Sequence, residues 1–287
     1  MFISEFIEYL KKIRRCSNRT YESYQYNLTR LNDWASNRSQ SLDTLTARDI
    51  KDYMCQLMDE GVQPKSINQF LSSFRSYYDY TCRFCGADNN PAVGIRDVRT
   101  PKTLPKFIRE EKMNLLIDKL LPATDFKRMR TRIIVLVFYH TGIRCSELAQ
   151  LTDDDICLST NCMKIRGKGN KERFVPFGDD LHDELLRYMQ MRPAGSSSFL
   201  RSISGQPLTQ WQIRIVTKMA LLRIVPADYA HPHVLRHTFA TVLMNHGAKI
   251  ERVKLLLGHA SVNTTCIYEH VSISSLKQIY NTAFQRI

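Results

Sequence analysis

The chain has 287 residues, of which 43% are hydrophobic and 24% are charged, and its formal net charge is +13 at neutral pH. This composition is ordinary for a globular protein and excludes a fibrous or largely disordered chain. The length favours two modest domains over one large core, and the positive excess favours a polyanionic partner such as nucleic acid.

The positive charge is concentrated in the second part of the chain. Residues 1–97 contain 13 Lys and Arg against 12 Asp and Glu, whereas residues 98–287 contain 28 against 16. A solvated, lysine-rich surface would be the simplest explanation. Many of these cations fall in glycine loops, in a linker and beside histidines rather than on periodic helix faces, which favours a site for an anion.

The first 95 residues predict a four-helix bundle. Apolar residues recur with helical spacing in four stretches: Phe2 to Ile13, Tyr21 to Leu31, Ile50 to Leu57 and Ile67 to Phe74. Thr46 is placed to cap the third helix, Gly61 to end it and Pro64 to open the fourth. We therefore assign residues 1–95 to an N-terminal helical domain.

The sequence after Gly86, ADNNPAVGIRDVRTPKTLPK, contains three prolines and no apolar periodicity. It predicts a linker, which we place at residues 96–106. Its cations are Arg96, Arg99, Lys102 and Lys106.

Residues 107–287 predict an α+β domain that is mostly helical with a small antiparallel sheet. Helical patterns begin near Arg109, Leu181, Thr209 and Pro232 and in ERVKLLL, and the apolar run IIVLVFY suits a buried helix. A short strand is expected at residues 156–158. The β-rich runs CMKIR and KERFVPF flank GKGN, which predicts a hairpin. The fold class is therefore mainly α.

The chain shows no apolar run of membrane-spanning length and no signal-peptide pattern, so we expect a cytoplasmic protein. Its eight cysteines then remain reduced thiols. Cys82 and Cys85 form a CxxC pair, but no second pair of zinc ligands follows. We expect no metal and no cofactor.

The segment HPHVLRHTFATVLMNHG predicts a helix with His233, Arg236 and His237 on one face. A metal site built on His231, His233 and His237 is disfavoured, because HExxH and helical carboxylates are missing and an arginine would repel the metal. Histidines packed at a helix start are the plainer alternative. The planar guanidinium of Arg236 suits phosphate oxygens, with His233 as a further donor.

Further cations complete a phosphate-sized set. Arg144 follows the buried helix and Gly142, although Glu147 could simply pair with it, and Lys168 lies in the glycine turn. Walker A is missing, and the consecutive Asp153, Asp154 and Asp155 cannot all converge as a two-metal site would need. Phosphoryl transfer without a metal requires fixed cations and a side-chain nucleophile. Tyr268 can be that nucleophile, provided that its surroundings assist loss of its proton.

Four sequence blocks resemble, in order, the active-site blocks of the tyrosine recombinases, the phage-integrase family, and most of all its Xer branch. These are TGIRCSEL, GKGNKERFVP, HPHVLRHTFAT and LGHASVNTTCIYEHV. The resemblance covers the second domain, and the helical bundle before it fits the family's SAM-like core-binding domain. Cys145 departs from the aliphatic residue usual at its position, and Cys266 stands two residues before Tyr268.

The resemblance implies a site-specific recombinase that cuts and rejoins duplex DNA without metal or ATP. It implies that Arg144 and Arg236 clamp the scissile phosphate, that His233 and His259 bind its oxygens, and that Lys168 protonates the leaving 5′ oxygen. Tyr268 would form a 3′-phosphotyrosyl link, with His233 assisting proton removal.

DNA would be gripped between the two domains, with salt-dependent phosphate contacts. We expect base contacts from the fourth helix through Lys65, Ser66, Asn68 and Gln69, types suited to the major groove, although an ordinary polar helix face is equally compatible. The resemblance also implies a homotetramer, or a heterotetramer with a related recombinase, at specific sites on nucleoid DNA. A type IB topoisomerase and a catalytically degenerate DNA-binding regulator remain the alternative functions. The segment after Tyr268 would pack on its own domain or on a neighbouring subunit.

Overall fold

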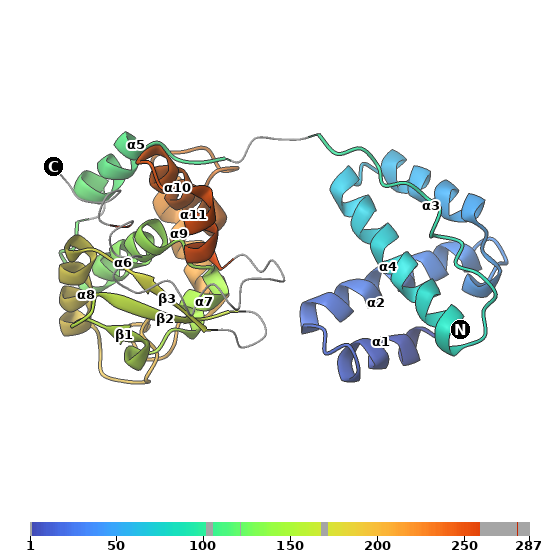
Figure 1. Cartoon of the computed structure of the whole chain (residues 1–287), viewed down its shortest axis with the longest axis horizontal. Helices are drawn as coiled ribbons and strands as arrows, with labels where there is room; N and C mark the ends of the chain where they lie inside the picture. Colours follow the sequence, from blue (N-terminus) through green and yellow to red (C-terminus); the bar gives the residue numbers. More distant parts are fainter. Residues whose placement is uncertain (1, 102–105, 121, 168–171, 259–279, 281–287) are drawn as a thin grey trace. The chain divides into compact units, whose positions relative to one another are not determined.

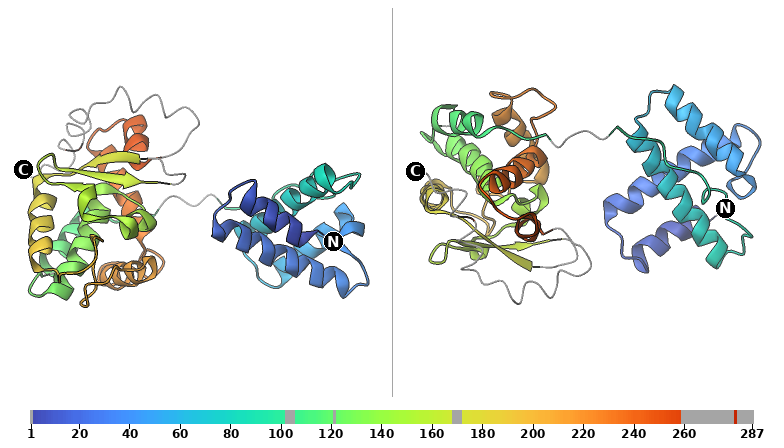
Figure 2. Two further views of the ribbon diagram at one scale, coloured as in Figure 1. Left: turned by 90° about the horizontal axis from the view of Figure 1, so that it is seen from below. Right: turned by 45° about the horizontal axis from the view of Figure 1, so that its top comes forward.

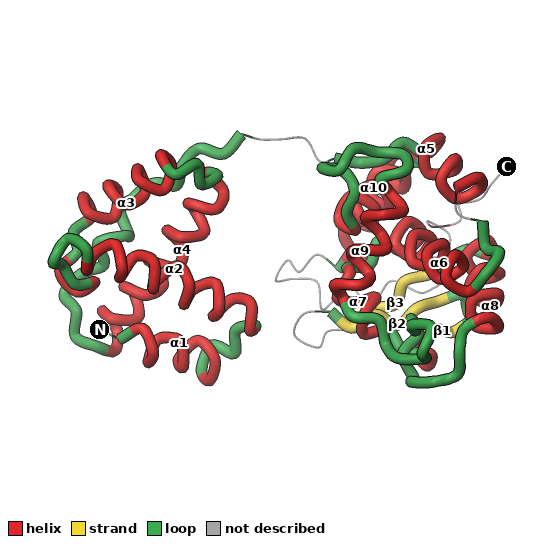
Figure 3. The backbone as a smooth tube through the Cα atoms, turned by 180° about the vertical axis from the view of Figure 1, so that it is seen from behind, coloured by secondary structure: helices red, strands yellow, loops and turns green. Residues whose placement is uncertain are grey.

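The computed structural model of the chain describes residues 2–101, 106–120, 122–167, 172–258 and 280. The chain divides into two compact units, Met1–Thr103 and Leu104–Ile287. Figure 1 labels their elements, and Figure 3 shows that helices form most of both units while the strands lie together in the second. The predicted fold class, mainly α with a small antiparallel sheet, is confirmed.

The N-terminal unit is the predicted helical bundle. Its elements are α1 (Ile3–Lys12), α2 (Asn18–Ser36), the 3-10 turn η1 (Leu42–Thr44), α3 (Ala47–Asp59) and α4 (Pro64–Phe84). The apolar faces of these helices meet in one core. Thr46 caps α3 as predicted, because its side chain accepts from the Asp49 N–H and the Asp49 carboxylate accepts from the Thr46 N–H.

Two details of this unit differ from the sequence prediction. Ile13 is 71% exposed, because α1 ends at Lys12 and the chain turns away through Arg15, whose φ is +47°. The chain after Gly86 is not simply a linker, because Ala92 and Ile95 are buried in the core of this unit. Short apolar contacts of this kind carry no periodicity that a sequence could reveal.

The C-terminal unit is built mainly of helices. They are α5 (Glu110–Leu115), the π-helical turn η2 (Leu116–Leu120), α6 (Phe126–Thr141), α7 (Cys145–Gln150), α8 (Asp179–Met191), α9 (Gln210–Leu221), α10 (Pro232–Asn245) and α11 (Ile250–Leu257). Helix α6 contacts α8, α9 and α10 and is buried along most of its length. Helices α10 and α11, orange to red in Figure 2, lie side by side.

The sheet of the C-terminal unit has three consecutive antiparallel strands. They are β1 (Ile156–Cys157), β2 (Cys162–Arg166) and β3 (Glu172–Pro176), preceded by the 3-10 turn η3 (Asp153–Asp155). Met163 faces Val175 and Ile165 faces Arg173 across the predicted hairpin. Met163, Ile165 and Val175 are buried, so one face of the sheet joins the core around α6.

Helix termini are fixed by the residues that the sequence marks for this purpose. Asp125 caps α6 by accepting from the Arg128 N–H, and Pro232 opens α10. Gly247 follows α10 with a φ of +85°. Among the described residues, no helix has both the length and the apolar character needed to cross a membrane.

Tyr280 packs on its own unit. It is 1% exposed, and its hydroxyl lies 2.7 Å from Nδ1 of His140 on α6. A Cβ added to Gly178 would lie 3.1 Å from the Tyr280 ring. Tyr280 is therefore a core residue of this unit in the single chain.

Candidate active site

Arg144 is placed by a turn that requires glycine. Helix α6 ends at Gly142, whose φ of +60° lies in the left-handed region. A Cβ at Gly142 would approach Cδ1 of Phe239 to 2.4 Å, a separation that ordinary contacts never reach. Glycine therefore allows the chain to turn against α10 and to begin α7 with Arg144 as its N-cap residue.

Arg236 is buried beside this turn. It projects from α10, is 7% exposed, and donates from Nη1 to the Gly142 carbonyl at 2.6 Å and from Nη2 to the Leu257 carbonyl at 2.5 Å. Burial lowers the pKa of Arg236 to about 10, and the nearby charges of Arg144 and Arg173 add to this effect. The guanidinium is still charged at neutral pH, so the site holds a desolvated cation.

Glu147 joins Arg144 to a second buried arginine, Arg173. Its Oε1 accepts from Arg144 Nη1 at 2.9 Å and from Arg173 Nη1 at 2.8 Å. Its Oε2 accepts from the Arg144 backbone N–H at 2.7 Å and from Arg173 Nη2 at 2.9 Å. Burial raises the pKa of Glu147, but the hydrogen bonds from Arg173 and Arg144 outweigh it, so the net pKa is lowered and the carboxylate stays charged.

Backbone carbonyls at the end of α11 accept hydrogen bonds from all three arginines. Arg173 Nε donates to the Leu256 carbonyl at 3.0 Å, Arg236 Nη2 donates to the Leu257 carbonyl, and Arg144 Nη2 donates to the Gly258 carbonyl at 3.3 Å. The last carbonyls of a helix lack partners within the helix and carry partial negative charge. Three successive carbonyls therefore hold three guanidinium groups side by side.

Charge does not balance among these four side chains. Three guanidinium groups meet one carboxylate, so two positive charges remain. Arg144 is also the accessible member, with 36% of its side chain exposed against 3% for Glu147. This arrangement can bind and polarise an anion, and a phosphate offers oxygens that match the guanidinium plane.

His233 lies one turn before Arg236 on α10. Desolvation lowers the pKa of His233, and the neighbouring charges of His231 and Arg236 lower it further. The imidazole is therefore biased toward the neutral form, which can accept a proton. Within the described residues, no group of three His, Cys, Asp or Glu side chains is arranged to hold a metal ion.

Three predicted site residues, Lys168, His259 and Tyr268, fall outside the described residues, and so does Cys266. Arg144, His233 and Arg236 are described, and Arg144 and Arg236 converge on α11. The pairing of Arg144 with Glu147, the alternative to a functional role for the arginine, is present and leaves the guanidinium partly accessible.

Sequence reasoning missed Arg173 and the structural role of Glu147. Arg173 occupies a buried position of β3, two residues before the buried Val175. The alternation in KERFVPF, with a charged residue at an inward position, was the available signal.

The predicted base-contacting residues lie in the first turns of α4. Lys65, Ser66 and Gln69 are exposed, and Gln69 donates to the hydroxyl of Ser23. Asn68 is committed elsewhere in this structure, because its amide donates to the Val98 carbonyl at 2.9 Å and accepts from the Val98 N–H at 2.8 Å. In this structure the side-chain amide of Asn68 is thus engaged by the backbone of its own unit.

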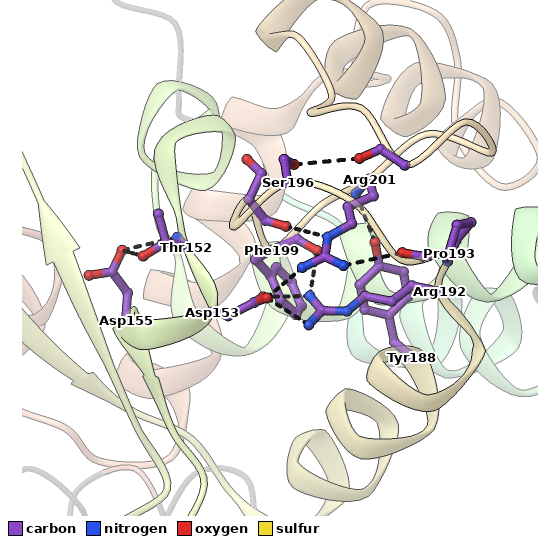
Figure 4. Close-up of polar contacts among 11 residues, drawn as sticks. Thr152, Asp153, Asp155, Tyr188, Arg192, Pro193, Ser196, Phe199 and Arg201 are labelled. Carbon is purple, nitrogen blue, oxygen red and sulfur yellow. Dashed lines mark hydrogen bonds and ion pairs between the residues drawn. The ribbon is translucent and has the colours of Figure 1, made fainter.

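The consecutive aspartates do not converge, as expected. Asp153 binds Arg192 and Arg201, while Asp155 caps Thr152 and binds Arg166. Figure 4 shows both arginines bonded to Asp153 and Arg201 bonded to the backbone of Pro193. Arg201 also donates to the Ser198 carbonyl. This second arginine cluster holds the loop before α9 against α8.

Comparison with known proteins gives consistent matches along both units. The Phage integrase family matches residues 106–274, and the Phage integrase, N-terminal SAM-like domain matches residues 3–83. Tyrosine recombinase XerC of Staphylococcus carnosus is 33% identical over 99% of this chain and 97% of its own length. Tyrosine recombinase XerC of Staphylococcus aureus (strain NCTC 8325 / PS 47) is 34% identical over 98% of this chain and 95% of its own.

Solved structures share the fold. The XerH site-specific recombinase bound to palindromic difH substrate, a post-cleavage complex, matches 97% of this chain and 84% of its own with a TM-score of 0.74 and 20% identity. The Tn1549 transposon integrase (aa 82–397) in complex with circular intermediate DNA matches 96% of this chain and 97% of its own with a TM-score of 0.72 and 18% identity.

Proposed function

This chain belongs to the phage integrase family and is a Xer-like tyrosine recombinase, and on that premise we propose that it cuts and rejoins duplex DNA at specific sites through a covalent link to Tyr268. One observation supports the site most directly. Arg144 and Arg236, 92 positions apart in the sequence, meet at the end of α11 with an excess of positive charge.

The proposed chemistry begins with the scissile phosphate between Arg144 and Arg236. Fixed cations stabilise the charge that builds on phosphate oxygens during displacement, and a desolvated guanidinium such as Arg236 does so strongly. His233, biased toward its neutral form, binds an oxygen and assists removal of the Tyr268 proton.

Tyr268 then attacks phosphorus, and a 3′-phosphotyrosyl bond forms as the bond to the 5′ oxygen breaks. Lys168 protonates that leaving oxygen, and His259 binds the phosphate. Because the link conserves the energy of the phosphodiester, a 5′-hydroxyl from a partner duplex can reverse the step. The strand transferase needs no metal and no ATP under this proposal.

DNA contacts are proposed to come from both units. The XerH relative was solved on its difH substrate and the Tn1549 integrase on circular intermediate DNA, which supports duplex DNA as the partner here. Residues 1–95 would be the core-binding domain, 96–106 a basic linker and 107–287 the catalytic domain. Lys65, Ser66 and Gln69 would face bases, whereas Asn68 would brace the chain at Val98.

The basic linker is in part engaged with the second unit. Lys106 forms an ion pair with Asp228, and its ammonium group lies over the ring of Tyr229 in a cation–π contact. Arg96, Arg99 and Lys102 are left as the linker's proposed phosphate contacts. The protein would act on DNA as a tetramer, either of this chain alone or with a related recombinase. It would reside in the cytoplasm, at the nucleoid.

The test uses a nicked suicide duplex that carries a site mapped by recovery of DNA bound to the protein. The full-length protein in EDTA and without ATP should form a covalent protein–DNA adduct, because the short strand lost at the nick blocks religation. Tyr268→Phe should form none, since the phenolic oxygen is the nucleophile. An adduct with Tyr268→Phe would contradict the assignment, and dependence on a divalent metal would revive the histidine-cluster alternative.

Two further assays separate the remaining functions. Joining of two different DNA molecules would distinguish a recombinase from a type IB topoisomerase, which relaxes a single duplex. Binding without any adduct would indicate a catalytically degenerate regulator.

A further inference from the structure

Arg173 stands at a position where the sheet predicts an apolar side chain. It lies on β3 opposite the buried Ile165 and two residues before the buried Val175. Its side chain is only 5% exposed. A charged group at such a place is costly to desolvate unless it is paired and hydrogen-bonded. The contacts that compensate this cost indicate what the residue does.

The guanidinium of Arg173 joins two parts of the site. Its Nη1 and Nη2 make parallel hydrogen bonds of 2.8 and 2.9 Å to the carboxylate of Glu147, and its Nε donates to the Leu256 carbonyl at 3.0 Å. Such a planar, bidentate pair fixes the orientation of both groups. The Arg173 side chain thus links the carboxylate of Glu147 to the end of α11.

The same carboxylate holds Arg144 on its other side. Glu147 accepts from both the side chain and the backbone N–H of Arg144, so it fixes the first residue of α7 as well as the guanidinium. Without Arg173, Glu147 would lose two donors in a buried place, and its remaining partner would be the partly exposed Arg144. The orientation of Arg144 therefore depends on Arg173 through Glu147.

Close packing restricts the other end of the same contact. A Cβ added to Gly258 would lie 3.0 Å from Cδ and 3.1 Å from Nε of Arg173. Gly258 supplies the carbonyl that accepts from Arg144. Arg173 thus contacts both groups that bind the Arg144 guanidinium: the carboxylate of Glu147 and the turn that ends α11.

We propose, resting on the recombinase function proposed above, that Arg173 is a positioning residue for phosphoryl transfer. It fixes Glu147 and the end of α11 so that the Arg144 guanidinium meets the scissile phosphate in one orientation. In this proposal Arg173 does not contact the phosphate, because its three nitrogens are engaged by the Glu147 carboxylate and the Leu256 carbonyl.

The experiment measures single-turnover adduct formation and DNA affinity on the suicide duplex for the full-length parent and three variants. Arg173→Ala should lower the cleavage rate by about 10²-fold, because a misoriented cation loses most of its stabilisation of the transition state. Arg173→Lys keeps the charge but not the planar pair, so its rate should fall between those of the parent and Arg173→Ala. DNA affinity should change less than about threefold in both, since other cations hold the backbone.

Arg166→Ala is the matched control. Arg166 lies on the adjacent strand, opposite Glu172; 42% of its side chain is exposed, and it pairs with the buried carboxylate of Asp155. Its loss removes one positive charge from the same sheet without touching Glu147 or α11, so it should cleave at the parental rate. A decrease equal to that of Arg173→Ala would mean that loss of charge, not of positioning, is responsible, and would overturn the proposal.

A second substrate separates positioning from mere structural support. A neutral methylphosphonate at the scissile position lowers the demand for the positive charge of Arg144. The deficit of Arg173→Ala should therefore shrink on that substrate by about tenfold, as should that of Arg144→Ala. An unchanged deficit would show that Arg173 does not act through Arg144.

The outcomes distinguish this inference from the function on which it rests. A parent protein that forms no adduct overturns the proposed function and this inference together. A parent that forms the adduct while Arg173→Ala or Arg173→Lys matches its rate overturns only the inference. If Arg173→Ala does not fold, judged by its unfolding transition, Arg173→Lys carries the comparison.

Discussion

Two arginine clusters in the C-terminal unit differ in how their charges are compensated. Around Asp153, Arg192 and Arg201 are 11% and 10% exposed, and their donors end on that carboxylate and on backbone carbonyls. In the cluster around Glu147, Arg173 and Arg236 are also buried, but the guanidinium of Arg144 reaches solvent. In this chain, burial of arginine alone therefore does not distinguish the proposed active site from the Asp153 cluster, whereas the accessible guanidinium of Arg144 does.

The largest expected effect tests the catalytic side of this comparison. Arg236→Ala should lower single-turnover cleavage by about 10³-fold, because it removes a desolvated cation from the phosphate. DNA affinity should fall only slightly, and the suicide-substrate assay with a parallel binding titration measures both. Cleavage within tenfold of the parent would contradict the role given to Arg236.

The second prediction tests the structural role of the arginine cluster around Asp153. Arg192→Ala should lower the free energy of unfolding by about 3 kcal/mol, because Asp153 loses its bidentate partner near the protein interior. Below its unfolding transition the variant should cleave at close to the parental rate. Urea unfolding followed by circular dichroism, with Arg166→Ala as the exposed counterpart, supplies the measurement. A catalytic loss without a loss of stability would erase the distinction between the clusters.

The third prediction concerns the turn that places Arg144. Gly142→Ala should cost about 2 kcal/mol of unfolding free energy and should also slow cleavage, because the added Cβ displaces Phe239 beneath the site. Gly247→Ala is the control, since Gly247 also has positive φ but no heavy atom lies within 4 Å of the added Cβ. Equal losses of stability and activity in both variants would show that backbone strain, not the contact with Phe239, dominates.

The smallest effect is a shift along the pH axis. Because desolvation and neighbouring charges lower the pKa of His233, its neutral form persists to lower pH than that of a free imidazole. The acid limb of the cleavage rate should therefore have its midpoint below the ordinary value of about 6.5, and His233→Ala should lack that limb. Rates measured between about pH 5 and 8 test this, and a midpoint above 6.5 would be inconsistent with it.

Much of the fold follows from local patterns, whereas the support of the site does not. The helices of the first unit and the β2–β3 hairpin repeat apolar residues with a fixed period, and Thr46 and Pro232 mark helix starts by their own chemistry. Helix α7 has only six residues, too few for a period to register. The docking of Ala92 and Ile95 likewise depends on contacts between distant residues.

The site shows the same division. Arg144, His233 and Arg236 were identified from residue types suited to a phosphate, and the resemblance then gave each a role; Arg173 lies in the block GKGNKERFVP, but the resemblance gave it none. Arg173 was missed because its meaning lies in Glu147, 26 positions away, and in Leu256, 83 positions away. Asn68 was predicted to read bases from its residue type alone, and its partner Val98 is 30 positions distant. A side chain's role depends on partners that the sequence places far apart.

The acceptors at residues 256–258 also set an order in time. The ribosome makes Arg144, Arg173 and Arg236 before it makes the three carbonyls that receive them. A nascent chain that has not yet completed α11 therefore lacks the shared acceptor of its arginines, although most of the C-terminal core residues have already been synthesised. A chain that stops before the end of α11 therefore cannot assemble the proposed phosphate site, whatever else of the unit has folded.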